Sequence, residues 1–282
     1  MARTNPSSPP EGPPWDLPIG EAPLAFVDLE MTGLDAERDR VVEVCIERWV
    51  GGACVGSLES LVSPGERVGG AAHVHGLGAA ELAGAPPFSQ LAERIVALLD
   101  GAVFIAHAAS WDLQFLAAEL ARLGRPFEVP HYLDTLVLSR RAFAFPSHSL
   151  NALCKQFALG SGAAHRAGDD VRVLRGVFER CVGALAPVSV RDLWEVRVAA
   201  RLARAAIVSR CEAAVEFGGP VVVTYRPARK PPQPLTMVLT EVRADLDPPK
   251  VLGYLLPGRG RRELRADRIL KVESPPSELE PC

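Results

Sequence analysis

Two acidic residues, Asp28 and Glu30, interrupt an apolar run, "LAFVDLEM", near the start of the chain. A β-strand turns alternate side chains to opposite faces, so Val27 and Leu29 point into one layer while the two carboxylates share the other. Neighbouring anions repel each other and lose hydration on burial, unless a cation lies between them. Carboxylate oxygens favour Mg²⁺ or Mn²⁺, so the run predicts a metal site; the alternative is the wet face of an edge strand.

The order of elements expected along the chain predicts a mixed sheet. Strands are expected at 24–29, 41–50 and 54–62, with the glycine pair "GG" forming a hairpin turn between the last two. Helical spacing of apolar residues at 88–99 leads into a strand at 102–107, and a further helix is expected over 110–124. Strands that alternate with helices after an opening hairpin indicate an α/β fold, a mixed sheet flanked by helices.

Helical periodicity predicts two further inward acids. Asp112 lies in the first turn of the helix at 110–124, on the same side as Phe115 and Leu116. In a later helix, Asp170 aligns with the apolar residues three, four and seven positions on, whereas Asp169 aligns with a more polar set. We therefore expect the carboxylates of Asp112 and Asp170 to face the sheet and that of Asp169 to face solvent.

One histidine, His165, is a candidate general base. It precedes Asp170 by five positions, which on one continuous helix would separate the two side chains by about 140°. Both can reach one site only if His165 lies in the loop before the helix, and the glycines of "GSGAAHRAG" allow that. A pKa near neutrality suits proton transfer beside four carboxylates. The alternative is an ordinary surface histidine.

Composition changes along the 282 residues, and we expect two domains. The predicted boundaries are a disordered Pro-rich leader over 1–22, the α/β domain over 23–185, a helical linker over 186–218, a small β unit over 219–273 and a flexible tail over 274–282. The apolar runs are too short to span a membrane, so we expect no membrane partner and a cytoplasmic location. The six cysteines are scattered and read as reduced thiols.

The charge is also unevenly distributed. Residues 221–272 hold eleven Lys or Arg against five Asp or Glu, although the whole chain has a formal net charge of -3. A basic segment attached to an acidic body suits a polyanionic partner.

Three motifs, in order along residues 24–182, resemble the DEDDh (DnaQ-like) family of 3'-5' exonucleases, in the ribonuclease-H-like superfamily. The motifs are "FVDLEMTGL", "FIAHAASWDLQFL" and "HRAGDD", the last with its second aspartate. The resemblance implies a ribonuclease-H-like fold and hydrolysis of phosphodiester bonds at single-stranded 3' ends of DNA or RNA. It also implies two divalent metal ions, Mg²⁺ or Mn²⁺, which activate water and stabilise the leaving oxygen.

The same resemblance assigns roles to individual residues. The implied metal ligands, which are also catalytic residues together with the general base His165, are Asp28, Glu30, Asp112 and Asp170. The implied contacts to the terminal nucleotide are Met31, Thr32, Leu34 and His107; the alternative for Met31, Thr32 and Leu34 is that they are turn and core residues.

Two features depart from the family pattern. The opening "DLEMTGLD" is very similar to oligoribonuclease, whereas later segments resemble the proofreading branch of polymerases, so the resemblance does not decide between DNA and RNA. We favour DNA as the substrate and keep RNA as the alternative. The second motif commonly reads His-Asn, and here Ala108 stands in place of the asparagine.

The C-terminal segment resembles the WYL domain of bacterial regulators, which implies a small SH3-like β-barrel and binding of nucleic acid or a nucleotide. The candidate contacts are Tyr225, Arg226, Arg259, Arg261, Arg262, Arg265 and Arg268. The alternative is a solvated charged face.

Two other functions compete with an independent exonuclease. The chain is a nucleic-acid- or nucleotide-sensing regulator with a WYL-like module, or it is a proofreading subunit in a polymerase or repair complex. Five intact catalytic positions argue against a purely regulatory role.

Overall fold

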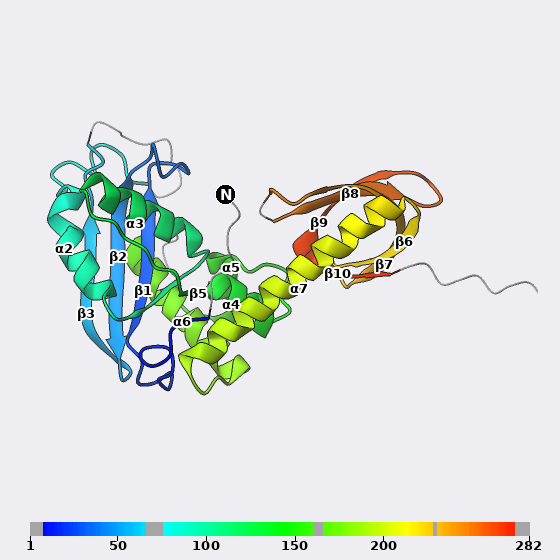
Figure 1. Ribbon diagram of the computed structural model, residues 1–282. Coiled ribbons are helices and arrows are strands. Elements are labelled where there is room, and N and C mark those ends of the chain that lie inside the picture. Colours follow the sequence, from blue (N-terminus) through cyan, green and yellow to red (C-terminus); the bar gives the residue numbers. More distant parts are fainter. Residues whose placement is uncertain (1–7, 66–75, 161–165, 228–229, 247, 274–282) are drawn as a thin grey trace, which may run out of the picture. The chain divides into compact units, whose positions relative to one another are not determined.

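The computed structural model describes residues 8–65, 76–160, 166–227, 230–246 and 248–273, except for the side chains of residues 200 and 201 (Figure 1). The chain divides into two compact units, Met1–Arg197 and Val198–Cys282. Among the helices of the described residues, none has both the length and the apolar character needed to cross a membrane.

The first unit is built on a five-stranded mixed sheet. Its strands are β1 (Leu24–Met31), β2 (Val41–Val50), β3 (Ala53–Leu61), β4 (Val103–Ala106) and β5 (Tyr132–Asp134), in the order β3-β2-β1-β4-β5. The first three strands pair antiparallel, and β4 lies parallel to both β1 and β5. The predicted α/β fold with a mixed sheet is therefore confirmed.

The hairpin between β2 and β3 has the predicted two-glycine turn. Val50 pairs with Ala53, and Gly51 and Gly52 between them have φ of 61° and 76°. Two consecutive residues with positive φ twist the turn in the sense that the strands require, and only glycine adopts this conformation without steric cost.

Helices cover both faces of this sheet (Figure 1). Helices α2 (Phe88–Leu99) and α3 (Ser110–Arg122) share an apolar core with Val27 and Leu29 of β1. The other face carries α6 (Ala167–Leu185), where the Phe26 and Phe178 rings meet edge to face at 5.5 Å between centroids. Because side chains alternate along β1, Asp28 and Glu30 lie on the side of α6. The remaining helices are α4 (Thr135–Ala142), α5 (Leu150–Phe157) and α7 (Val190–Phe217).

The leader differs from the prediction of disorder through residue 22. Residues 8–22 are ordered against the first unit, and Trp15 is only 5% exposed. Its ring packs edge to face on Trp194 at 5.8 Å and against His131 at 6.1 Å. The many prolines suggested disorder, but one large aromatic side chain buries enough apolar surface to hold the segment in place.

The second unit contains an antiparallel sheet. Its strands are β6 (Pro220–Tyr225), β7 (Gln233–Arg243), β8 (Lys250–Leu255), β9 (Arg261–Arg265) and β10 (Ile269–Glu273), with a 3-10 turn, η1 (Ala266–Arg268), before β10. The strand order is β10-β6-β7-β8-β9. Cys211 and Ala214 of α7 join the apolar core of this sheet.

An SH3-like barrel is not established for this unit. A closed barrel requires the two outer strands to pair, and among the described residues β9 and β10 are at opposite ends of the strand order. The structure therefore confirms a separate small antiparallel sheet, and not the closed barrel.

Candidate metal centre

Three of the predicted acids converge on one point of the first unit. Asp28 and Glu30 come from β1, and Asp170 comes from the first turn of α6. One carboxylate oxygen from each lies within 4.8 Å of the others. Neighbouring Asp169 instead forms an ion pair with Arg172, at 2.7 Å between Oδ1 and Nη2. The periodicity of α6 therefore predicted correctly which of the two aspartates joins Asp28 and Glu30.

A fourth acid, Asp112, borders this group from α3. Its side chain is buried, only 6% exposed, as the periodicity of the helix predicts. Its carboxylate accepts a hydrogen bond from the backbone of Leu29, and its negative charge raises the pKa of Asp28. Asp112 is close enough to influence the metal centre but is outside the group of three whose oxygens meet within 4.8 Å.

The four carboxylates perturb one another. Burial raises the pKa of Asp28 well above its usual range, and the charges of Asp112, Asp170 and Glu30 raise it further. Burial and the charge of Asp170 raise the pKa of Glu30 to about 7. Burial is also the main reason that the pKa of Asp112 rises to about 8.

This arrangement fits a divalent cation. The site holds clustered oxygen donors, and burial together with their mutual repulsion raises the pKa values of Asp28 and Glu30. Hard cations such as Mg²⁺ and Mn²⁺ take oxygen ligands of this type.

An ion pair between a buried glutamate and an exposed arginine, which the sequence interpretation missed, holds the start of α6. Glu43 of β2 is 1% exposed and accepts hydrogen bonds from Arg166, at 3.1 Å from Nε and 2.8 Å from Nη2. The same carboxylate accepts the backbone N–H of Ala167 at 3.0 Å, which satisfies a free donor of the first helical turn. Glu43 pairs in register with Glu30 on β1, so this contact fixes α6 beside the metal centre. The signal available in the sequence was an acid inside the apolar run "VVEVCI".

A second buried acid organises the segment that follows β1. Glu119 of α3 accepts from Arg40, at 2.7 Å from Nε and 2.9 Å from Nη2, and from the backbone N–H of Val41 at 3.2 Å. Thr32 is buried, and its hydroxyl donates to Asp39 at 3.1 Å. The chain between β1 and β2 is therefore tied down at both ends.

The predicted nucleotide contacts on this segment differ in exposure. Leu34 is 78% exposed, so an apolar side chain stands out from an ordered loop close in sequence to Asp28 and Glu30. Met31 is half-buried and packs against the main core, and the Thr32 hydroxyl is already bonded within the protein. Of these three side chains, Leu34 is the one most accessible to a ligand.

His107 is held by the protein on both sides of its ring. Nδ1 lies 2.9 Å from Thr135 Oγ1, and Nε2 lies 2.9 Å from the carbonyl oxygen of His148. Burial lowers its pKa to about 4, so the ring is neutral at neutral pH. These contacts occupy both nitrogens, and a role for His107 in nucleotide binding stays a prediction.

Ala108, which replaces the family's asparagine, has an unusual backbone. Its φ is 64°, in the left-handed region that asparagine tolerates better than alanine. Its N–H donates to Asp134 Oδ1 at 3.0 Å, which anchors the turn between β4 and α3. The predicted general base, His165, lies outside the described residues.

The C-terminal candidates do not form one equivalent set. Arg265 is paired with Asp267, at 2.9 Å between Nη2 and Oδ2, and Tyr225 packs against the core of the second unit. Arg226 is exposed, and its backbone N–H donates to the carbonyl oxygen of Arg268 at 2.9 Å. The Arg268 residue is half-buried. The other candidates, all exposed, are Arg259, Arg261 and Arg262.

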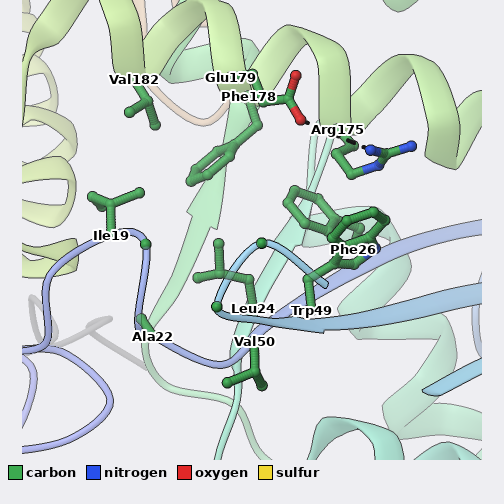
Figure 2. A pocket seen from close by; sticks show the side chains of 13 residues that line it. Ile19, Ala22, Leu24, Phe26, Trp49, Val50, Arg175, Phe178, Glu179 and Val182 are labelled. Atoms are coloured by element: carbon green, nitrogen blue, oxygen red, sulfur yellow. Dashed lines mark ion pairs between the residues drawn. The ribbon is translucent and has the colours of Figure 1, made fainter. Parts of the chain in front are cut away.

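A separate apolar pocket lies near the start of β1, as Figure 2 shows. Its volume is about 220 Å³, and its walls include Leu24, Phe26, Trp49 and Phe178. The guanidinium of Arg175 lies 4.2 Å from the Trp49 ring centroid. None of the clustered carboxylates lines this pocket, so it is distinct from the metal centre.

Comparison with known proteins gives a family for the first unit. The exonuclease family model, RNase_T, matches residues 25–178. The DNA polymerase III PolC-type protein of Thermotoga maritima is 28% identical over 183 residues, which cover 64% of this chain and 13% of that protein. A DNA polymerase III subunit epsilon-like protein of Rhodobacter capsulatus is 32% identical over 200 residues, 67% of this chain and 28% of that protein. The chain thus spans less than a third of the length of either relative.

Solved structures agree on the fold. Escherichia coli exonuclease I in a zinc-bound complex with single-stranded DNA superposes with a TM-score of 0.54 at 15% identity, over 83% of this chain and 54% of that one. Another exonuclease I structure covers 90% of this chain and 65% of its own length with a TM-score of 0.53 at 14% identity. With the matching family model and the acids gathered on its sheet, the chain belongs to the RNase_T exonuclease family, in the DnaQ-like branch of the ribonuclease-H-like superfamily.

Proposed function

We propose that this protein is a metal-dependent exonuclease that removes nucleotides from the 3' end of single-stranded DNA. The observation that carries the proposal is the convergence of Asp28, Glu30 and Asp170 within 4.8 Å, with buried Asp112 beside them. The matched family and the single-stranded DNA bound by exonuclease I support the substrate class.

The metal ligands in this proposal are the clustered carboxylates. One divalent ion would be held by Asp28, Glu30 and Asp170, and a second would take ligands from Asp28 and Asp112. Two Mg²⁺ or Mn²⁺ ions supply charge neutralisation, an activated water and stabilisation of the leaving oxygen. The protein contributes the placement of the ligands, because α6 is fixed by the contact between Glu43 and Arg166.

Other residues act on the substrate and on its proton. His165 takes the proton of the attacking water, as its place five residues before Asp170 suggests. The exposed side chain of Leu34 contacts the terminal base from the ordered segment after β1. Met31, Thr32 and His107 shape the same side of the site from half-buried or buried positions.

A digestion with labels at either end tests the direction and the metal requirement. With Mn²⁺ or Mg²⁺, a 5'-labelled oligonucleotide is expected to give a ladder of shortened products, whereas a 3'-labelled one releases labelled mononucleotide first. EDTA and the substitution Asp28→Asn each abolish both patterns. Early release of the 5' label, or digestion that persists in EDTA, would refute the proposal.

The choice of DNA over RNA is tested by matched substrates. Two relatives of this chain have names that refer to DNA polymerase III, which favours DNA. A dT oligomer is expected to be shortened faster than the U oligomer of equal length, and faster digestion of the U oligomer would assign the enzyme to RNA.

A second candidate function is proofreading within a polymerase or repair complex in the cytoplasm. The names of two relatives favour it, since one is a DNA polymerase III PolC-type protein and the other a DNA polymerase III subunit epsilon-like protein. Co-purification of a polymerase with the tagged chain would support this role.

A further inference from the structure

The β8–β9 ribbon of the second unit has two different faces. Val251 and Leu255 of β8 belong to the apolar core of this unit. Side chains alternate along a strand, so Leu252 and Tyr254 point to the opposite face. Both are half-buried, and the Tyr254 ring therefore keeps part of its surface open to solvent.

Two arginines flank this tyrosine. Arg261 of β9 is the cross-strand partner of Tyr254, which places the two side chains on the same face of the sheet. The Arg259 guanidinium lies over the face of the Tyr254 ring, with its central carbon 5.9 Å from the ring centre. Arg262 pairs with Gly253 and lies two residues before the buried Leu264 on the same strand. Its side chain therefore points to the face that carries the apolar core, away from Tyr254.

The charges of Arg259 and Arg261 are available to a ligand. Several other basic residues of this unit are neutralised locally, as in the ion pairs of Lys250 with Glu263 at 2.6 Å and Arg265 with Asp267 at 2.9 Å. Among the described residues, Arg259 and Arg261 have no acidic side chain within 4.0 Å, and both are exposed. This part of the sheet therefore presents uncompensated positive charge.

We propose that Tyr254, Arg259 and Arg261, here called the tyrosine platform, bind single-stranded DNA. A base stacks on the Tyr254 ring in place of the Arg259 guanidinium, and the guanidinium groups of Arg259 and Arg261 bind the phosphates on either side of that base. A duplex keeps its bases stacked inside, and a polyanion without bases has nothing to place on the ring. The platform thus distinguishes a single strand from other polyanions. The choice of this ligand rests on the proposed exonuclease function.

Binding of the full-length chain to 5'-fluorescein-labelled dT20, followed by fluorescence anisotropy in EDTA, tests the proposal without digestion. Tyr254→Ala and Tyr254→Leu are each expected to weaken binding by about tenfold, with the slope of log Kd against log salt unchanged. Tyr254→Phe keeps the ring and binds within about twofold of wild type. Thermal melts establish that each variant is folded, and the leucine variant preserves apolar bulk at this half-buried position.

Arginine variants test the phosphate contacts. Arg261→Gln is expected to weaken binding and to reduce the salt slope by about 0.7. The matched control is Arg243→Gln, because Arg243 of β7 is already paired with Glu241 at 2.8 Å; this variant should bind within about twofold of wild type. Because the platform recognises bases, unlabelled duplex and heparin are expected to compete only weakly with the labelled dT20.

Wild-type affinity for dT20 in both Tyr254→Ala and Tyr254→Leu would overturn the platform. Equal weakening by Tyr254→Phe would also overturn it, since the aromatic ring is intact in that variant. Digestion with Mn²⁺ is measured separately on the wild-type chain. Intact binding without digestion would refute the exonuclease function alone, and digestion without any effect of Tyr254 would refute the platform alone.

Discussion

At the scale of single residues, the metal centre is destabilised by its own charges. Asp28, Glu30 and Asp112 are partly or fully buried beside one another, and the pKa of each is raised. Such groups favour the folded state when they are protonated and oppose it when they are ionised. A divalent cation bound at the proposed site would offset this repulsion, so the proposal predicts that stability depends on both pH and metal.

The linkage gives a prediction with a definite sign. The folded-state pKa values of Glu30 and Asp112, about 7 and about 8, lie above their unfolded values. The stabilisation is fully present below the unfolded values and is lost as pH rises to the folded values, so in EDTA the Tm should fall from about pH 5 to about pH 8 and level off above that. Adding Mn²⁺ at pH 8 should raise the Tm again. In Asp112→Asn the decrease of Tm over this pH range should be smaller by about 2–4 °C. A Tm in EDTA that is constant across this range in both proteins would contradict the assignment.

At the scale of secondary-structure elements, the centre depends on how α6 is attached to the sheet. Asp28 and Glu30 are on one continuous strand, whereas Asp170 is brought to them by the helix. Glu43 holds that helix through Arg166 and the N–H of Ala167. Glu43, which is outside the group of three carboxylates, thus positions one of them.

A double-mutant cycle tests this positioning contact. Glu43→Gln and Arg166→Gln are expected to couple by about 1 kcal/mol in the free energy of unfolding, because removing either charge leaves the other without its partner. The coupling is moderate because the Arg166 side chain is 47% exposed. Glu179→Gln with Arg166→Gln is the matched control on the same helix and should be additive. Additivity of the Glu43 pair would show that the contact does not hold α6.

What the sequence could predict at this scale follows from the range of the interactions. The hairpin of β2 and β3 was predictable because Gly51 and Gly52 determine the turn locally. Asp170 was preferred to Asp169 because helical periodicity is also local. The pairing of Glu43 with Arg166 joins residues 123 positions apart, and no short pattern contains it.

At the scale of the whole molecule, the chain combines an exonuclease unit with a small antiparallel sheet. The matched family covers residues 25–178, so the second unit has to be interpreted from its own residues. The basic composition of residues 221–272 predicted a surface for a polyanion, but not which side chains share a face. Strand register supplies that information, since it pairs Tyr254 with Arg261 and separates Arg262 from them. The ordered leader was likewise not predictable, because Trp15 is buried only by contact with Trp194.

The most direct test of the metal centre compares two adjacent aspartates of α6. Both Asp170→Asn and Asp169→Asn remove one negative charge at the start of the same helix, but only Asp170 belongs to the group within 4.8 Å. The rate of 3'-end shortening of a 5'-labelled dT20 with Mn²⁺ is predicted to fall about a thousandfold or more in Asp170→Asn, a loss of about 4 kcal/mol in transition-state stabilisation. Asp169→Asn should stay within about threefold of wild type. Equal rates for the two variants would contradict the assignment of Asp28, Glu30 and Asp170 as the metal-binding centre of this exonuclease.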